Sequence, residues 1–103
     1  MIRYVIMHEH GTVQLKLYPD YQEQIYSTAY LYALWVDEDH RREHIATLLL
    51  DKAEELAKAD GHKSIALEWS LEEAPREIAW WYARRGYDEK EFGNTCALMV
   101  KDL

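Results

Sequence analysis

A long apolar stretch at residues 26–36, followed closely by a helical pattern at residues 41–59, most constrains how this chain can fold. Both alternating faces of Tyr26–Val36 are largely apolar, which predicts a central strand covered on both sides. In Arg41–Ala59 apolar residues recur at spacings of three and four and form one face, which predicts a helix packed on a sheet. Asp39 is the expected N-cap of this helix and Gly61 its expected C-terminal stop.

The rest of the chain predicts shorter strands and one more helix. The expected strands are residues 2–8 and 12–17, joined by a turn at His10-Gly11, and then 64–69, 87–92 and 95–101. A second helix is expected from about Pro75 to Gly86. In the long strand, Ala29, Leu31, Ala33 and Trp35 are expected to share one face, and Tyr30, Tyr32, Leu34 and Val36 the other. This order indicates an α+β fold with a mixed, α/β-type sheet, in one domain over residues 1–103.

Composition excludes several classes of function. The 103 residues suffice for one core, and 49% hydrophobic with 30% charged residues is typical of a globular protein. No apolar run approaches the roughly 20 residues of a membrane span, and the N-terminus reads as a strand rather than a signal peptide. The net charge of −7 opposes nucleic-acid binding and permits a cationic substrate such as an amine. The lone Cys96 fits a reducing compartment, so we expect a cytoplasmic protein.

Residues 34–46 contain the clearest candidate site. The strand end Leu34-Trp35-Val36 is followed by an acidic turn, and Arg41-Arg42 then opens the helix. Exposed amide N–H groups at a helix start, with arginine beside them, suit a phosphate ligand. An ordinary solvated first turn of an amphipathic helix is the alternative, and these residues alone leave both interpretations open.

The order of elements and two motifs together resemble the GNAT superfamily of N-acetyltransferases. The family's pyrophosphate loop, Arg/Gln-x-x-Gly-x-Gly/Ala, is matched by residues 41–46, and the lead-in through Leu34-Trp35-Val36 and His40 is also similar. Downstream, residues 81–87 look like the family's aromatic–Tyr–x–x–x–Gly–aromatic helix end. The match covers about residues 26–101. It implies an acyl-CoA N-acyltransferase fold, with a central, mostly antiparallel sheet and two main helices.

The resemblance implies acetyl-CoA as cosubstrate and acetyl transfer to a primary amine by direct attack. The implied cofactor-binding residues are Leu34, Trp35 and Val36 for the pantetheine arm and acetyl carbonyl, and Arg41, Arg42, Glu43, His44, Ile45 and Ala46 for the pyrophosphate. Tyr82 matches the tyrosine that protonates the departing thiolate, as a general acid. Glu68, on the strand between the motifs, is the predicted base for the amine.

Three departures from the family pattern bear on function. His44 replaces the glycine at the fourth loop position, and Pro75 stands where many members carry a cofactor-contacting asparagine. The strand and two helices that usually precede the first hairpin are expected to be missing, which makes this a small, N-terminally shortened member. The acceptor side should then be open, or completed by a second copy in a homodimer. An open side favours a protein lysine or another bulky amine over a small enclosed metabolite.

Other interpretations remain open at this point. A degenerate member would bind CoA or a protein partner without catalysis, and an unrelated α+β protein would act through oligomer contacts. Tyr82 alone would read as a core aromatic beside Ile78 and Trp81. The pairs His40/His44 and His8/His10 have spacings that suit a metal, but neither has a clear third ligand and the chain has no cysteine pair, so we predict no metal site.

Overall fold

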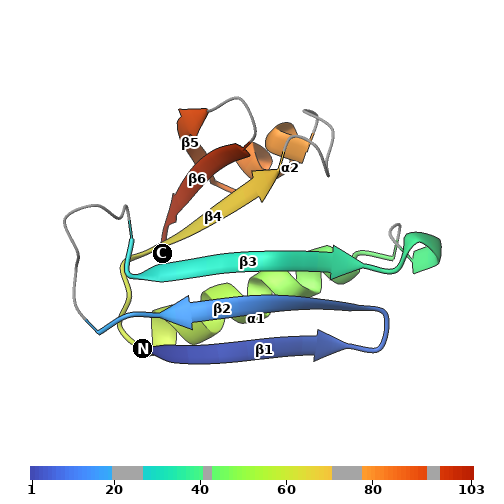
Figure 1. Cartoon of the computed structure of the whole chain (residues 1–103), viewed down its shortest axis with the longest axis horizontal. Coiled ribbons are helices and arrows are strands. Elements are labelled where there is room, and N and C mark those ends of the chain that lie inside the picture. The colour runs from blue at the N-terminus through green and yellow to red at the C-terminus, as the bar shows by residue number, and fades with distance from the viewer. Residues whose placement is uncertain (20–26, 41–42, 71–77, 93–95) are drawn as a thin grey trace.

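The fold is a six-stranded sheet with two helices, seen in a computed structural model that describes residues 1–19, 27–40, 43–70, 78–92 and 96–103 (Figure 1). The elements in chain order are β1 (Ile2–His8), β2 (Gly11–Leu17), β3 (Ala29–Val36), the 3-10 turn η1 (Glu38–His40), α1 (Ile45–Ala59), β4 (Ser64–Ser70), α2 (Ile78–Arg84), β5 (Asp88–Phe92) and β6 (Cys96–Asp102). The predicted helix start at Pro75 lies outside the described residues.

The strands are arranged in the order β1-β2-β3-β4-β6-β5. All neighbouring pairs are antiparallel except β3 and β4, which run parallel and are connected through α1. A parallel pair needs a crossover connection of this kind. The predicted α+β fold with a mostly antiparallel mixed sheet and two main helices is therefore confirmed.

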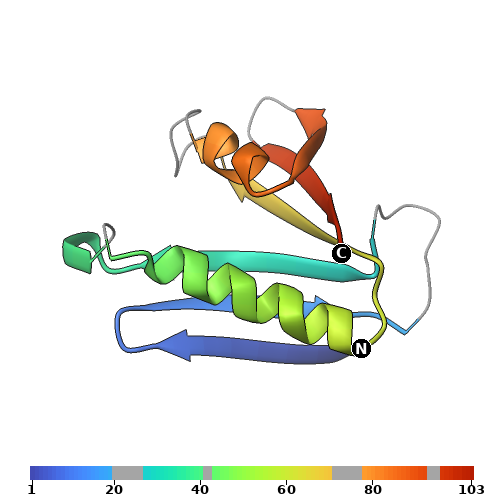
Figure 2. The ribbon, with the colours of Figure 1, turned by 180° about the vertical axis from the view of Figure 1, so that it is seen from behind.

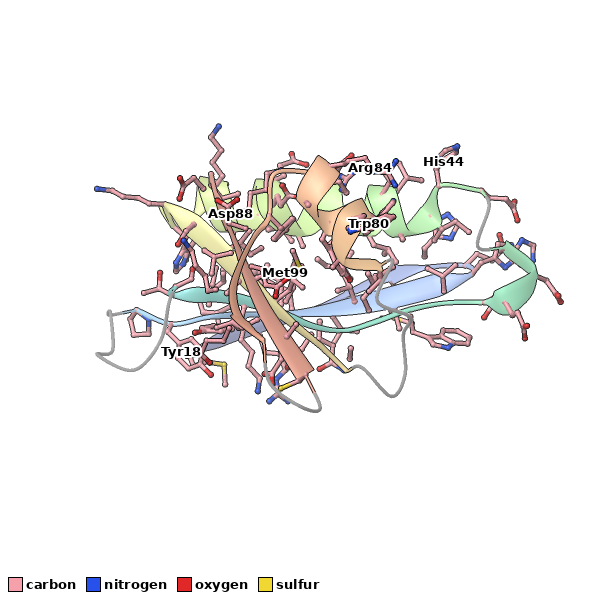
Figure 3. All side chains as sticks on the ribbon, turned by 90° about the horizontal axis from the view of Figure 1, so that it is seen from above. Tyr18, His44, Trp80, Arg84, Asp88 and Met99 are labelled. Carbon is pink, nitrogen blue, oxygen red and sulfur yellow. The ribbon has the colours of Figure 1, made fainter. Side chains whose placement is uncertain are left out.

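Both helices lie against the same face of the sheet (Figures 2 and 3). The core is formed there, from alternate residues of β2 packed against the apolar face of α1; its members include Val13, Leu15, Leu17, Leu49, Leu50 and Ala53. The prediction that β3 is covered on both sides is wrong, because neither helix reaches the opposite face. Tyr30 and Tyr32 lie on β3 outside the core and are only half-buried.

A β-bulge interrupts the alternation of β3. Gln14 pairs with Tyr32 and Thr12 with Trp35, so β3 carries one more residue than β2 in this interval. Ala33 lies inside the bulge with a left-handed φ of 54°. The extra residue reverses the faces beyond it: Val36 is buried, like Ala29 and Leu31, while Trp35 is 54% exposed. The face assignment predicted for residues 33–36 is therefore wrong.

The parallel strands β3 and β4 separate soon after they meet. Their pairing is limited to Tyr30 with Ala66 and Leu31 with Leu67. Beyond these pairs the two strands diverge toward their carboxyl ends and form a V, with the start of α1 near the open end (Figure 1). Residues 32–36 of β3 therefore run along the split without pairing to β4.

The helix boundaries differ from the sequence prediction at one end. α1 begins at Ile45 with His44 as N-cap, so the expected start at Arg41 and the expected cap Asp39 are wrong; Asp39 lies in η1. The helix starts only after His44, because the left-handed φ of 61° at this residue does not fit a right-handed helix. The predicted stops are confirmed, because Gly61 and Gly86 have φ of 91° and 97° just after α1 and α2. Within the described part of the chain, neither helix has the length and apolarity needed to cross a membrane.

Candidate functional site

On the β3 side of the split, the backbone pairs with β2 but not with β4. Leu34 is half-buried, Trp35 is exposed and Val36 is buried, and all three lie beyond the last pairing with β4. The peptide groups of Leu34 and Trp35 therefore lie along the split beyond the paired part of β4. The sequence resemblance named these three residues, and the structure places them together along one edge of the split.

Sequence reasoning missed Ala33, the bulge residue of this edge. A left-handed conformation costs a residue with a Cβ roughly 1–2 kcal/mol, and such strain clusters at functional sites. Nothing in Ala33-Leu34-Trp35 signals a bulge, since glycine or asparagine would be the usual marker. The bulge changes the direction of the β3 backbone at the point where β3 leaves β4.

The amino end of α1 supplies N–H groups that bind no carbonyl within the helix. The first helical hydrogen bond runs from the Leu48 N–H to the His44 carbonyl at 3.1 Å, and no side chain caps this end. The N–H groups of Ile45, Ala46 and Thr47 precede that bond and have no carbonyl within the helix to bind. They point to where the helix dipole concentrates positive charge, so the end suits an anion. Thr47 was not among the predicted residues.

The four other predicted loop residues have different outcomes. The Glu43 N–H already donates to the His40 carbonyl at 3.2 Å, so this group is not free for a ligand. Arg41 and Arg42 lie outside the described residues. His44 takes the left-handed conformation at φ 61° and ψ 23° that glycine commonly supplies, and its side chain points away from the sheet (Figure 3). The histidine therefore preserves a glycine-like backbone path into the helix.

Tyr82 lies on α2 and is buried, with 6% of its surface exposed. Its ring makes edge contacts with Trp81 and Tyr87, at centroid distances of 5.1 and 5.8 Å. Burial raises its pKa from 10.0 to about 12, because the phenolate would lose its hydration. The phenol is therefore fully protonated at neutral pH and can act as a proton donor. Its neighbour Trp80, by contrast, is 69% exposed.

Glu68 lies on the opposite face of the sheet from Tyr82. Leu67 belongs to the helix-covered core, and the next residue on β4 points to the other face, where Glu68 is exposed. Glu68 also follows the last residue of β4 that pairs with β3. The two predicted catalytic residues therefore lie on opposite faces of the sheet.

On the helix-covered face of the sheet, two ion pairs connect α1 to the segment after α2 and to β6. Arg85, just after α2, pairs with Asp51 of α1 at 2.5 Å, and Lys101 of β6 pairs with Glu54 of α1. Tyr87 lies beside Glu54 but not in hydrogen-bonding geometry, and its hydroxyl is buried without a partner in the described structure. Burial and the Glu54 carboxylate both raise the Tyr87 pKa. These contacts fix α2 and its neighbouring strands relative to α1.

Folding stability should show the burial of Tyr82 at alkaline pH. Unfolded Tyr82 ionises near pH 10 and the folded residue only near 12, so its contribution is complete below pH 10 and is lost as the pH rises toward 12. Urea unfolding at pH 8 and 11 should show wild type losing about 1.4 kcal/mol more than Tyr82→Phe. Equal losses in the two proteins would contradict the raised pKa.

A metal centre has no support in the described residues. No group of three or more histidine, cysteine, aspartate or glutamate side chains there is arranged to hold a metal ion.

Comparison with protein families gives one match. The acetyltransferase (GNAT) family model matches residues 10–87, which include the split, the start of α1 and Tyr82. No curated protein sequence matches the chain.

Solved structures with the same fold include several acetyltransferases. An acetyltransferase from Bacillus cereus ATCC 14579 is 23% identical with a TM-score of 0.70, over 99% of this chain and 72% of that one. The PaiA N-acetyltransferase from Thermoplasma acidophilum, in complex with coenzyme A, is 19% identical with a TM-score of 0.72, over 91% and 54%. The NatC complex bound to Gag peptide and CoA is 19% identical with a TM-score of 0.71, over 90% and 60%. The chain thus spans between about half and three quarters of these relatives.

Proposed function

Since the chain belongs to the acetyltransferase (GNAT) family, we propose that it transfers an acetyl group from acetyl-CoA to a primary amine. The observation that carries this proposal is the split between β3 and β4, which opens beside the uncapped amino end of α1. One end of the site offers unpaired strand backbone to an extended amide-bearing arm, and the other offers helix N–H groups to phosphate. Acetyl-CoA has both chemical features in one molecule.

The residues present fit this cosubstrate. We assign the pyrophosphate to the N–H groups of Ile45, Ala46 and Thr47, with Arg41 and Arg42 as candidate charge-assisted contacts. The pantetheine arm would lie along residues 34–36, beyond the last pairing of β3 with β4. His44 does not block the approach, because its side chain points away from the sheet. Pro75 lies outside the described residues, and no cofactor contact is assigned to this position.

The proposed base and the proposed acid act from opposite faces of the sheet. Glu68, on the uncovered face, accepts a proton from the incoming ammonium, directly or through water. The amine nitrogen then bonds to the acetyl carbon and loses its second proton to solvent, while the carbon–sulfur bond breaks. Tyr82, on the helix-covered face, donates its phenolic proton to the departing thiolate and is reprotonated by solvent. Holding both reactants in the split would itself supply much of the rate.

The open acceptor side favours a protein lysine or another bulky amine. Glu68 and Trp35 are exposed near the end of the split, and the helices cover only the other face. The net charge of −7 also attracts a cationic acceptor. One relative of the same fold, the NatC complex, was solved with a peptide as well as CoA. These observations support a peptide-sized acceptor but do not name its sequence.

We further propose a cytoplasmic homodimer. The edge strand β1 exposes Ile2, Tyr4, Val5 and Met7, and an apolar edge of this kind commonly pairs with another chain. The lone Cys96 favours a reducing compartment. Light scattering on the purified protein, with Val5→Lys as comparison, would test the dimer; a monomer at all concentrations would contradict it.

Two measurements, made one after the other, test the proposed acetyl transfer. Calorimetry with CoA should show binding, and its absence would remove the enzyme proposal. If CoA binds, thiol release from acetyl-CoA should be measured with free lysine, a polyamine and lysine-containing peptides. Faster release with peptides is the expected result. Binding without release from any amine would instead favour a CoA-binding module without catalysis.

A further inference from the structure

Two histidine rings stack on each other next to the start of α1. The imidazoles of His10, in the β1–β2 turn, and His40, in η1, have centroids 3.5 Å apart and planes only 8° apart. His8 lies at the end of the same hairpin, and its Nδ1 accepts the His10 N–H at 3.1 Å. The side chains of His10 and His40 are about one third or less exposed. The stack therefore joins two segments far apart in the sequence.

A continuous set of hydrogen bonds accompanies the stack. The Asp37 N–H donates to the His10 carbonyl at 2.7 Å, and the His40 N–H donates to the Asp37 carbonyl at 2.9 Å. The Asp37 carboxylate also lies 3.5 Å from His10 Nδ1. His40 Nδ1 then pairs with the Glu43 carboxylate, while the Glu43 N–H donates to the His40 carbonyl. Glu43 immediately precedes His44, the N-cap of α1.

Close backbone packing supports the same connection. A Cβ added to Gly11 would lie 2.8 Å from the Trp35 carbonyl oxygen and 3.2 Å from Ile45 Cγ2. The β1–β2 turn is thus pressed against the end of β3 and the first residue of α1. Together the stack and the packing fix where the free N–H groups of α1 lie relative to the end of β3.

We propose that His10 and His40 are positioning residues that hold the amino end of α1 in place to bind the pyrophosphate. This inference rests on the proposed use of acetyl-CoA. Neither imidazole is assigned a contact with the cosubstrate or the reacting atoms. Their stack orders the anion-binding N–H groups before the ligand arrives, and such pre-organisation lowers the cost of binding.

The test compares two acetyl donors. S-acetylpantetheine has the thioester and the arm of acetyl-CoA but no pyrophosphate. In His40→Ala and His10→Ala, KM for acetyl-CoA should rise about 10-fold, as expected when a binding group is slightly misplaced, while kcat at saturation stays near the wild-type value. KM for S-acetylpantetheine should not change. His40→Phe keeps a flat ring for stacking and should recover most of the lost affinity for acetyl-CoA. Glu43→Ala should raise the KM for acetyl-CoA less than His40→Ala does.

A histidine at the other end of α1 provides the matched control. His62 bonds to Asp60 Oδ2 at 2.9 Å and to Thr28 Oγ1 at 2.6 Å, so His62→Ala also removes contacts that anchor a helix end. It should lower the unfolding temperature without changing KM for either donor. If His62→Ala raises KM for acetyl-CoA as much as His40→Ala does, the effect is general destabilisation and the inference is overturned.

Failure of the inference and failure of the proposed function give different results. If wild type binds no CoA, the proposed function fails. If wild type binds and acetylates, but His10→Ala and His40→Ala keep its KM for acetyl-CoA, only the inference fails. An equal rise in KM for both donors would also overturn it, because the effect would then not act through the pyrophosphate.

Discussion

Replacing Tyr82 with phenylalanine is expected to lower kcat by roughly 100-fold, the usual scale for losing a general acid. The ring packed between Trp81 and Tyr87 remains, so the protein should fold as before. The affinity for CoA should hardly change, because the hydroxyl acts on the sulfur only as the carbon–sulfur bond breaks. Steady-state kinetics with a saturating peptide acceptor, together with calorimetry, would separate the two effects.

Tyr87→Phe is the matched control for Tyr82→Phe. Both tyrosines are buried in the same cluster, and the pKa of both is raised by burial. The Tyr87 hydroxyl is buried without a hydrogen-bond partner in the described structure, so removing it should leave kcat unchanged and stability equal or higher. If both variants lose the same activity, or neither does, Tyr82 is a packing residue and another group protonates the thiolate.

Replacing Thr47 with aspartate is expected to change stability and ligand affinity in opposite directions. A carboxylate in the first turn of α1 interacts favourably with the helix dipole and the free N–H groups, and should stabilise the fold by about 0.5 kcal/mol. The same carboxylate lies where the pyrophosphate is proposed to bind, and like charges this close repel each other strongly. We expect the Kd for CoA to rise at least roughly 10-fold, since each 1.4 kcal/mol of repulsion is worth a factor of ten.

Thr47→Asn separates charge from shape in this experiment. It has the size of aspartate without its charge, so the difference between the two variants measures the repulsion alone. Calorimetry with CoA and thermal unfolding of each variant give the two quantities. Equal CoA affinities for Thr47→Asp and Thr47→Asn, with the helix stabilised, would mean that the pyrophosphate does not bind at this end of α1.

The elements with strong local signals could be predicted from the sequence. The hairpin, expected at 2–8 and 12–17, is observed as Ile2–His8 and Gly11–Leu17. Gly61 and Gly86 end their helices as expected, since each needs a left-handed conformation that glycine adopts without strain. Tyr82 was found through its place in a motif, because a buried tyrosine by itself looks like any core aromatic.

The parts that were missed depend on backbone geometry rather than on residue type. Strict alternation assigned the faces of β3 correctly up to the bulge, but one extra residue at Ala33 reversed them afterward. The start of α1 was placed at Arg41 because the helical pattern begins there, although η1 occupies the residues just before. Thr47 is proposed to bind through its N–H, a group that every residue except proline shares, so its side chain gave no indication.

Because the pairing of β3 with β4 is short, we expect the middle of the sheet to be its least stable part. Only two residue pairs join the strands there, whereas β1 and β2 pair along seven. Hydrogen exchange should therefore begin in the interior of the sheet rather than at its outer hairpin, since the two halves can separate locally without unfolding. A ligand that contacts both β3 and β4 would hold the two strands together. The amides of β3 and β4 would then exchange among the slowest in the protein.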